Sequence, residues 1–128
     1  MIERVQYWVE VSEYDLDTAE AMLLSKRYLY VGFMCHQSVE KILKAYYCSK
    51  FNDQPPFTHG LLLLAEKSGI IEELTDDIVE FIDTLQPLNI EARYPSDKEA
   101  LLGYLTPEKC REILDNTRKT VQWIKTKL

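Results

Sequence analysis

Three long segments repeat apolar residues at the spacing of an amphipathic α-helix, and they cover residues 2–25, 28–51 and 106–128. The stripe of the first segment contains one polar residue, and its members are Val5, Trp8, Val9, Ser12, Leu16, Ala19 and Leu23. No segment alternates apolar and polar residues over enough positions to predict a β-strand. The pattern therefore favours an all-α protein.

Threonines mark the expected starts of the other helices, because a threonine at the N-cap accepts a hydrogen bond from the first helical turn. Thr58 precedes a short apolar segment that ends near Gly69. Thr75 precedes acidic residues, and Thr106 precedes a proline, which suits the first turn of a helix. These signals predict a short third helix, a fourth helix that ends near Pro87, and the start of the last long helix.

The connection between the fourth and last predicted helices is the longest in the chain, at residues 88–104. It contains Pro95 and Gly103, so we predict a loop. A long loop either carries function or only straps two helices together. Taken together, the segments predict an all-α, up-and-down bundle of about five helices. The length of 128 residues fits one domain that covers residues 1–128.

Composition and charge narrow the class of protein. The chain is 46% hydrophobic and 28% charged, and its net charge of −6 argues against broad binding of nucleic acid. Acidic residues gather in residues 66–91, either as a solvated face or as a docking surface for a basic partner. No apolar run of about 18 residues predicts a membrane span. The N-terminus is charged and amphipathic, so we expect a cytoplasmic protein.

Standard motifs for metal, phosphate and nucleophile chemistry do not occur in the sequence. The three cysteines form no CxxC pair, and Cys35 and Cys110 fall on apolar helix faces, where we interpret them as core residues. His36 and His59 lack metal-ligand spacing, and there is no GxGxxG, Walker or HExxH motif. We therefore predict neither a metal site nor a cofactor.

Polar residues on the second long segment provide a candidate ligand site. Gln37, Glu40 and Lys44 stand at i, i+3 and i+7, so they share one helix face. Polar groups on a mostly apolar helix either face water or meet partners inside the protein. An arginine fork suits phosphate or carboxylate, and a tyrosine can stack on a base or supply a hydroxyl. The candidate ligand-binding residues are Gln37, Glu40, Lys44, His59, Arg93 and Tyr94.

The same residues also permit a purely structural interpretation. Glu40 would pair with Arg93, or with Lys44 beside it, and tie the long loop to the bundle. His59 would bond the backbone or a neighbouring helix from the first turn of the third helix. Both interpretations require Glu40 and Lys44 to point inward, within reach of Arg93.

The chain resembles the HEPN domain family over nearly its whole length. The resemblance rests on the stretches HQSVEKILKAYY, PPFTHGLLLL and EARYP, followed by a final amphipathic helix. It implies a helical bundle, and because many members are dimers it implies a homodimer. Many members are similar to the toxin half of a toxin–antitoxin pair whose other half is a minimal nucleotidyltransferase. Others are implicated in nucleotide binding, so the resemblance implies both that partner and a nucleotide ligand.

The ribonuclease members of the family carry an Arg-x4–6-His motif, and this sequence departs from it. Arg93 is followed by YPSDKEA, and no histidine occurs beyond His59. RNA cleavage needs a proton shuttle beside the arginine that grips the phosphate. Tyr94 and Tyr104 are only loose candidates for the tyrosine that nucleotidyltransferases modify in some members.

We therefore expect a HEPN domain protein that partners a minimal nucleotidyltransferase as the toxin-type component and binds nucleotide or phosphate at the polar residues. One alternative is a metal-independent ribonuclease with a degenerate Arg/His site, although the motif does not support RNA as the ligand. The other is a non-catalytic helical scaffold whose polar residues only lock the loop.

Overall fold

The computed structural model describes residues 3–89 and 95–128 of the chain, and these residues form helices and no strand. The all-α prediction is confirmed. The α-helices are α1 (Glu3–Leu24), α2 (Tyr28–Phe51), α3 (Leu61–Ser68), α4 (Asp76–Leu85), α5 (Pro95–Tyr104) and α6 (Pro107–Lys125). The short 3-10 turns η1 (Ile70–Glu72) and η2 (Gln86–Leu88) follow α3 and α4.

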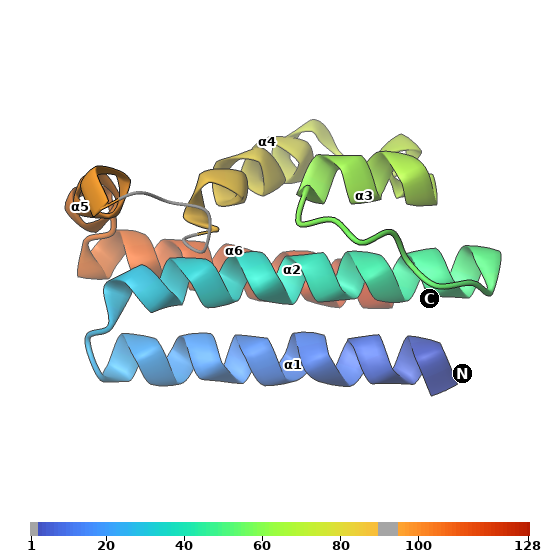
Figure 1. Ribbon diagram of the computed structural model, residues 1–128, viewed down its shortest axis with the longest axis horizontal. Coiled ribbons are helices and arrows are strands. Elements are labelled where there is room, and N and C mark those ends of the chain that lie inside the picture. The colour runs from blue at the N-terminus through green and yellow to red at the C-terminus, as the bar shows by residue number, and fades with distance from the viewer. Residues whose placement is uncertain (1–2, 90–94) are drawn as a thin grey trace.

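Helix α2 is the central element of the bundle (Figure 1). It packs against α1 along its length and also contacts α3, α4, α5 and α6. Figure 1 shows α1 antiparallel to α2, with α3 and α4 on the opposite side of α2 from α1. Because neighbours surround it, α2 buries polar positions as well as apolar ones, which is unusual for a helix in a small domain.

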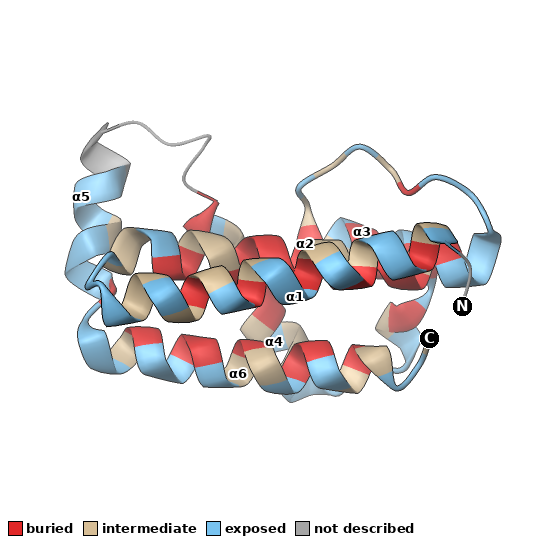
Figure 2. Cartoon of the chain, turned by 90° about the horizontal axis from the view of Figure 1, so that it is seen from below, coloured by how far each residue is buried: buried red, intermediate tan, exposed pale blue. Residues whose placement is uncertain are grey.

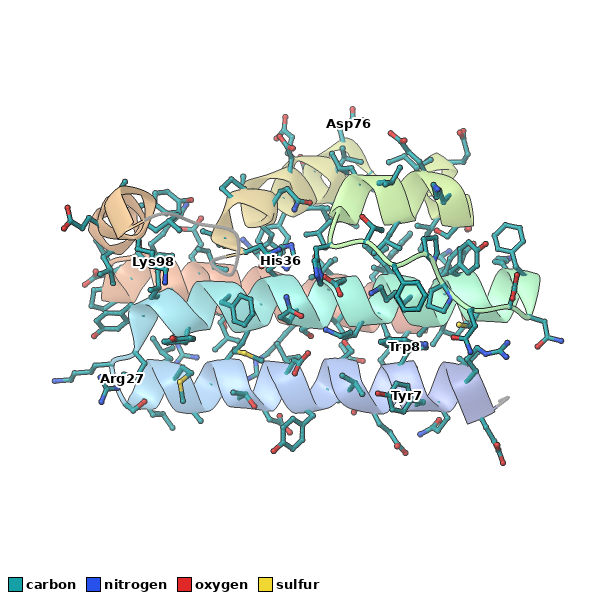
Figure 3. The ribbon with its side chains drawn as sticks, in the orientation of Figure 1. Tyr7, Trp8, Arg27, His36, Asp76 and Lys98 are labelled. Carbon is teal, nitrogen blue, oxygen red and sulfur yellow. The ribbon has the colours of Figure 1, made fainter. Side chains whose placement is uncertain are left out.

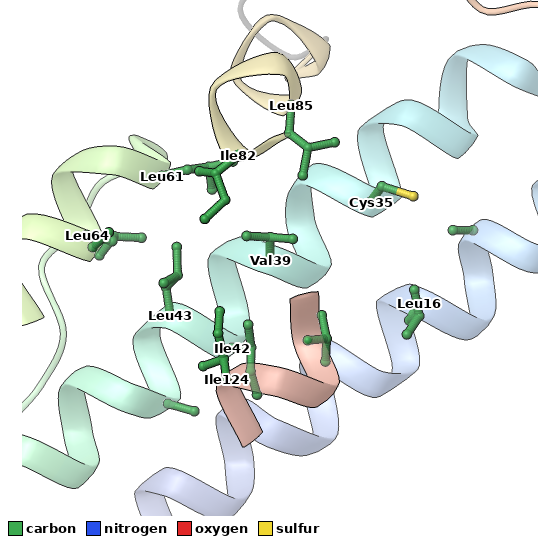
Figure 4. Packing of buried hydrophobic residues seen from close by; sticks show 14 of the residues in the cluster. Leu16, Cys35, Val39, Ile42, Leu43, Leu61, Leu64, Ile82, Leu85 and Ile124 are labelled. Carbon is green, nitrogen blue, oxygen red and sulfur yellow. The ribbon is translucent and has the colours of Figure 1, made fainter. Parts of the chain in front are cut away.

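The hydrophobic core gathers around the middle of α2 (Figure 4). Val39, Ile42 and Leu43 have no exposed surface. The residues that surround them come from α1, α3, α4 and α6, and they include Leu16, Leu61, Leu64, Ile82, Leu85 and Ile124. Figure 2 shows the buried residues of α6 on the side that faces α1 and α2. Cys35, Cys48 and Cys110 are free and buried, as the interpretation of Cys35 and Cys110 as core residues predicts.

The one polar residue of the α1 stripe marks a close contact between α1 and α2. Ser12 Oγ donates to the backbone oxygen of Ser38 at 2.7 Å, and Ser38 Oγ donates to the backbone oxygen of Ser12 at 2.8 Å. Small side chains allow the two backbones to approach, and the reciprocal bonds satisfy both buried hydroxyls. A polar residue on this stripe therefore stabilises the packing of the two helices.

Two of the three predicted threonine caps are confirmed. Thr75 Oγ1 accepts from the Ile78 amide at 3.3 Å, and Thr106 Oγ1 accepts from the Lys109 amide at 3.2 Å. The cap at Thr58 is wrong, because α3 begins later, at Leu61. Thr58 Oγ1 instead accepts from the Gly60 amide at 3.1 Å, within the segment that precedes the helix.

The prediction of a loop throughout residues 88–104 is also wrong in part, because α5 occupies Pro95–Tyr104. Proline is tolerated at the first position of a helix, where its missing N–H has no intrahelical partner in any case. Gly103 lies next to the end of α5, where a helix tolerates it at low cost. Pro95 and Gly103, which we interpret from the sequence as loop signals, therefore lie at the two ends of a short helix.

In the described part of the chain, no helix has the length and apolar composition that crossing a membrane requires.

Candidate functional site: a polar cluster on helix α2

The predicted polar face of α2 is buried inside the molecule. Gln37 exposes 9% of its surface, Glu40 exposes 1% and Lys44 exposes 7%. Helix α1 covers one side of this face, and the segment 52–60 runs along α2 on its way to α3 (Figure 1). Glu40 and Lys44 therefore point inward, as both interpretations of the sequence require.

The carboxylate of Glu40 is the centre of the cluster. Its Oε1 lies 2.8 Å from His59 Nδ1, and its Oε2 lies 3.1 Å from Lys44 Nζ. Lys41 Nζ is also 3.6 Å from Oε2. Burial raises the pKa of Glu40, but the hydrogen bond from His59 and the two lysines outweigh burial, so the pKa lies below its usual value. Glu40 is therefore ionised at neutral pH and holds three donors around it.

His59 presents an imidazole at the surface end of this cluster. It lies in the segment before α3 rather than in the first turn of that helix, and 58% of its side chain is exposed. A carboxylate can only accept, so the bond to Glu40 requires a proton on Nδ1. In the parts of the chain that the structure describes, Nε2 has no hydrogen-bond partner. The geometry thus leaves one ring nitrogen free to meet a ligand.

Lys41 connects the cluster to α1. Its Nζ donates to Gln37 Oε1 at 2.7 Å and lies 3.7 Å from Asp15 Oδ2. Burial is the main reason why the pKa of Asp15 is raised. Neither Lys41 nor Asp15 is among the ligand-binding residues that the sequence predicts. The i, i+4 spacing of Gln37 and Lys41 could have indicated that Lys41 belongs to the site. Nothing in the sequence indicates that Asp15 pairs with Lys41.

Gln86 fixes the backbone that carries His59. Its Nε2 donates to the backbone oxygen of His59 at 3.1 Å, and its Oε1 accepts from the Leu61 amide at 2.8 Å. The same Nε2 lies 3.5 Å from His36 Nε2. The other ring nitrogen of His36, Nδ1, lies 3.4 Å from Gln37 Nε2, so amide nitrogens flank the ring on both sides. Figure 3 shows His36 on the side of α2 that faces α4.

His36 supports the cluster from the protein interior. Its side chain has no exposed surface, and burial lowers its pKa to about 4, although Glu40 opposes this shift. The ring is therefore neutral at pH values near 7, with one N–H donor and one acceptor nitrogen. Gln86, which lies beside His36, positions the backbone of His59, and the sequence gives no signal for this arrangement.

Lys44 links the cluster to the aromatic residues of α1. Its Nζ lies 5.3 Å from the centroid of the Trp8 ring, a cation–π distance. Figure 3 shows Trp8 on the side of α1 that faces α2. Within the described ranges 3–89 and 95–128, no group of His, Cys, Asp or Glu is arranged to hold a metal ion.

Arg93 and Tyr94, the other two predicted ligand residues, lie outside the described residues. The alternative partner for Glu40 that the sequence allows, Lys44, does form a pair with it. The geometry therefore brings together Gln37, Glu40, Lys44 and His59, and adds Asp15, Lys41, His36 and Gln86 around them.

The fold and the polar cluster define a class of helical-bundle protein with an ionised network on its central helix. A family model described as the HEPN domain matches residues 5–127, so the chain belongs to the HEPN domain family. The crystal structure of TT1696 from Thermus thermophilus is similar, with a TM-score of 0.83 and 23% sequence identity. The match covers 99% of this chain and 100% of that one, and at this identity it shows the fold alone. A comparison with curated proteins found no match.

Proposed function

We propose that this HEPN domain protein binds the phosphate groups of a nucleotide at the cluster of Glu40, Lys44 and His59. The observation that carries the proposal is the bond between Glu40 Oε1 and His59 Nδ1, at 2.8 Å. A buried carboxylate that orients an exposed imidazole leaves the other ring nitrogen available for a ligand. Gln37 belongs to the site indirectly, because it holds Lys41 beside Glu40.

The charges of the cluster support an anionic ligand. Glu40 and Asp15 are balanced by Lys41 and Lys44, so an anion at His59 meets no excess of negative charge. When the ring of His59 carries both protons, its Nε2 donates to a phosphate oxygen while Nδ1 still donates to Glu40. In this proposal Arg93 adds a bidentate contact to phosphate, and Tyr94 adds a stacking surface or a hydroxyl.

Isothermal titration with ATP, GTP and AMP tests the proposal. The wild type should release or absorb heat at millimolar nucleotide or below, and His59→Ala should bind at least about tenfold more weakly because a charge-assisted hydrogen bond is lost. Lys67→Ala is the matched control, since Lys67 is an exposed cation near the other end of α3. Absence of heat with every nucleotide would remove the proposal.

We also propose that the protein partners a minimal nucleotidyltransferase as the toxin-type component of a pair. Membership of the HEPN family supports this, and so does the exposed acidic face of α4, formed by Asp76, Asp77, Glu80 and Asp83. Such a face suits a basic partner surface. Co-purification with a nucleotidyltransferase encoded by a neighbouring gene tests the idea, and failure of the two purified proteins to associate contradicts it. Homodimer formation and a cytoplasmic location belong to the same proposal.

A second candidate function is metal-independent cleavage of RNA. The specific observation in its favour is that Glu40 holds the ring of His59 in one orientation, as a general base or acid requires. Cleavage of RNA by the wild type that is lost in His59→Ala and Glu40→Gln would support this function. An inert wild type on a wide set of RNAs would leave the binding function or a helical scaffold.

A further inference from the structure

A surface cavity of about 540 Å³, open to solvent, lies between the start of α1 and the segment that follows α2. Its lining residues are Glu3, Arg4, Tyr7, Trp8, Asn52 and Gln54. Their side chains are two aromatic rings, two amides, one carboxylate and one guanidinium. The volume falls in the range of small-molecule sites, roughly 300–1,000 Å³.

Two observations connect this cavity to the Glu40 cluster. Trp8 lines the cavity, and Lys44 of the cluster lies 5.3 Å from the centroid of its ring. Asn52 and Gln54 begin the segment that runs along α2 and carries His59 (Figure 1). A ligand that spans from His59 to the cavity would therefore follow one continuous segment of chain.

The aromatic residues of the cavity suit a flat ring. Tyr7 and Trp8 have ring centroids 5.1 Å apart and an interplanar angle of 77°. Rings that meet at nearly a right angle allow a planar ligand to stack on one while its edge meets the face of the other. Tyr7 exposes 57% of its surface, so one of these rings is accessible without any rearrangement of the core.

The polar lining suits the edge of a nucleobase. Asn52 and Gln54 each carry an amide that donates and accepts, the combination that reads adenine at its N6 and N7 positions. Arg4 carries the donor fork that suits guanine at O6 and N7. The edge of a heteroaromatic ring can replace the water that these accessible groups bind, whereas an aliphatic chain cannot, so the lining favours a heteroaromatic ring over a lipid chain.

We infer that the cavity at Tyr7 and Trp8 holds the nucleobase of a nucleotide whose phosphates lie at His59 and Lys44. The inference rests on the proposed function, because it places the second half of the same ligand. It assigns a role to the start of α1, for which the sequence alone predicts only an amphipathic helix. The ligand class is a nucleoside phosphate, with the base stacked on Tyr7.

The experiment separates the base from the phosphates. The chain has two tryptophans, so a Trp123→Phe background leaves Trp8 as the only indole reporter. This protein is titrated with ATP, with adenosine and with inorganic tripolyphosphate, and both the fluorescence of Trp8 and the heat of binding are recorded. We expect ATP and adenosine to quench Trp8 strongly, and tripolyphosphate to bind with a much smaller change in Trp8 fluorescence, since Lys44 also lies against the ring.

A matched pair of tyrosine variants then tests the stacking contact. Tyr7→Ala should weaken the binding of ATP by roughly 5- to 150-fold, the range for one base–aromatic stack, and leave the affinity for tripolyphosphate unchanged. Tyr14 is the control, since it lies two helical turns along α1, exposes 74% of its surface and does not line the cavity. Tyr14→Ala should bind ATP as the wild type does.

The outcomes distinguish the inference from the proposed function. Equal ATP affinity in Tyr7→Ala and the wild type would overturn the inference and leave the phosphate site standing. Quenching by adenosine with no binding of tripolyphosphate would support the base pocket and overturn the phosphate site. No response to ATP, adenosine or tripolyphosphate would overturn both.

Discussion

His36 has no exposed surface, and its ring contacts amides rather than water. Its pKa falls from 6.5 to about 4 because burial disfavours the imidazolium. The unfolded chain therefore binds more protons than the folded protein between these values, and the free energy of unfolding decreases as pH falls through that window. The facing groups Glu40, His59 and Lys41 modify the shift but do not reverse it.

His36→Gln isolates this contribution. Between about pH 7 and about pH 5 the wild type should lose roughly 2 kcal/mol more unfolding free energy than the variant, whose amide does not titrate. Urea denaturation at the two pH values measures both proteins. Equal losses of stability in the two proteins would show that His36 is not held neutral by the fold.

Glu40 is the counterion of a lysine that has little access to water. Replacing the carboxylate in Glu40→Gln keeps the side-chain volume but leaves Lys44 buried without its partner, and the expected cost is about 3 kcal/mol. Urea denaturation at neutral pH measures it. Glu112→Gln is the control, because its pair with Lys109 is exposed and should contribute less than about 1 kcal/mol. Similar costs for the two variants would contradict the buried network.

Gln86 holds the start of α3 through hydrogen bonds to the backbone of His59 and Leu61. The Leu61 amide is the first N–H group of α3 and has no partner within the helix, and Gln86 Oε1 accepts a hydrogen bond from it at 2.8 Å. Gln86→Ala should destabilise the protein by about 1–3 kcal/mol and increase hydrogen exchange at the Leu61 amide. Thr84→Ala is a nearby control, since the hydroxyl of Thr84 donates to the backbone oxygen of Phe81 within its own helix. Unchanged exchange at Leu61 would remove this role of Gln86.

The sequence predicts the long helices better than it predicts the connections between helices. Long apolar stripes locate α1, α2 and α6, and the caps Thr75 and Thr106 locate two helix starts, because these signals are local. The cap at Thr58 fails because the donor at the start of α3 is satisfied by a residue far along the chain. Helix α5 is missed because proline and glycine signal a break equally well at the ends of a helix and in a loop.

In the candidate site, too, the sequence predicts what lies along one helix but not which residues of other segments meet it. The spacing of Gln37, Glu40 and Lys44 predicts a shared face, and their burial agrees with that prediction. The contacts of Glu40 with His59, and of Lys41 with Asp15, depend on how α1 and the segment 52–60 pack on α2. Sequence spacing along one helix carries no information about such neighbours, so these pairings require the fold.

The net charge of −6 and the acidic face of α4 lead to a prediction about association. If a nucleotidyltransferase docks on this face, Asp77→Lys and Glu80→Lys should each slow association, and added salt should slow it for the wild type. Surface plasmon resonance at two ionic strengths measures the rates. Glu10→Lys on α1 changes the net charge equally and serves as the control. Equal slowing by Glu10→Lys would indicate a general charge effect rather than docking on α4.

The proposed site requires that the free nitrogen of His59 meets the phosphate of a ligand while His36 stays buried and neutral. ¹⁵N NMR during titration with ATP follows the ring nitrogens of both histidines. We expect the Nε2 signal of His59 to move toward its protonated value as ATP is added, and the signals of His36 hardly to move. If the His59 signals do not move at millimolar ATP, phosphate does not bind at this ring.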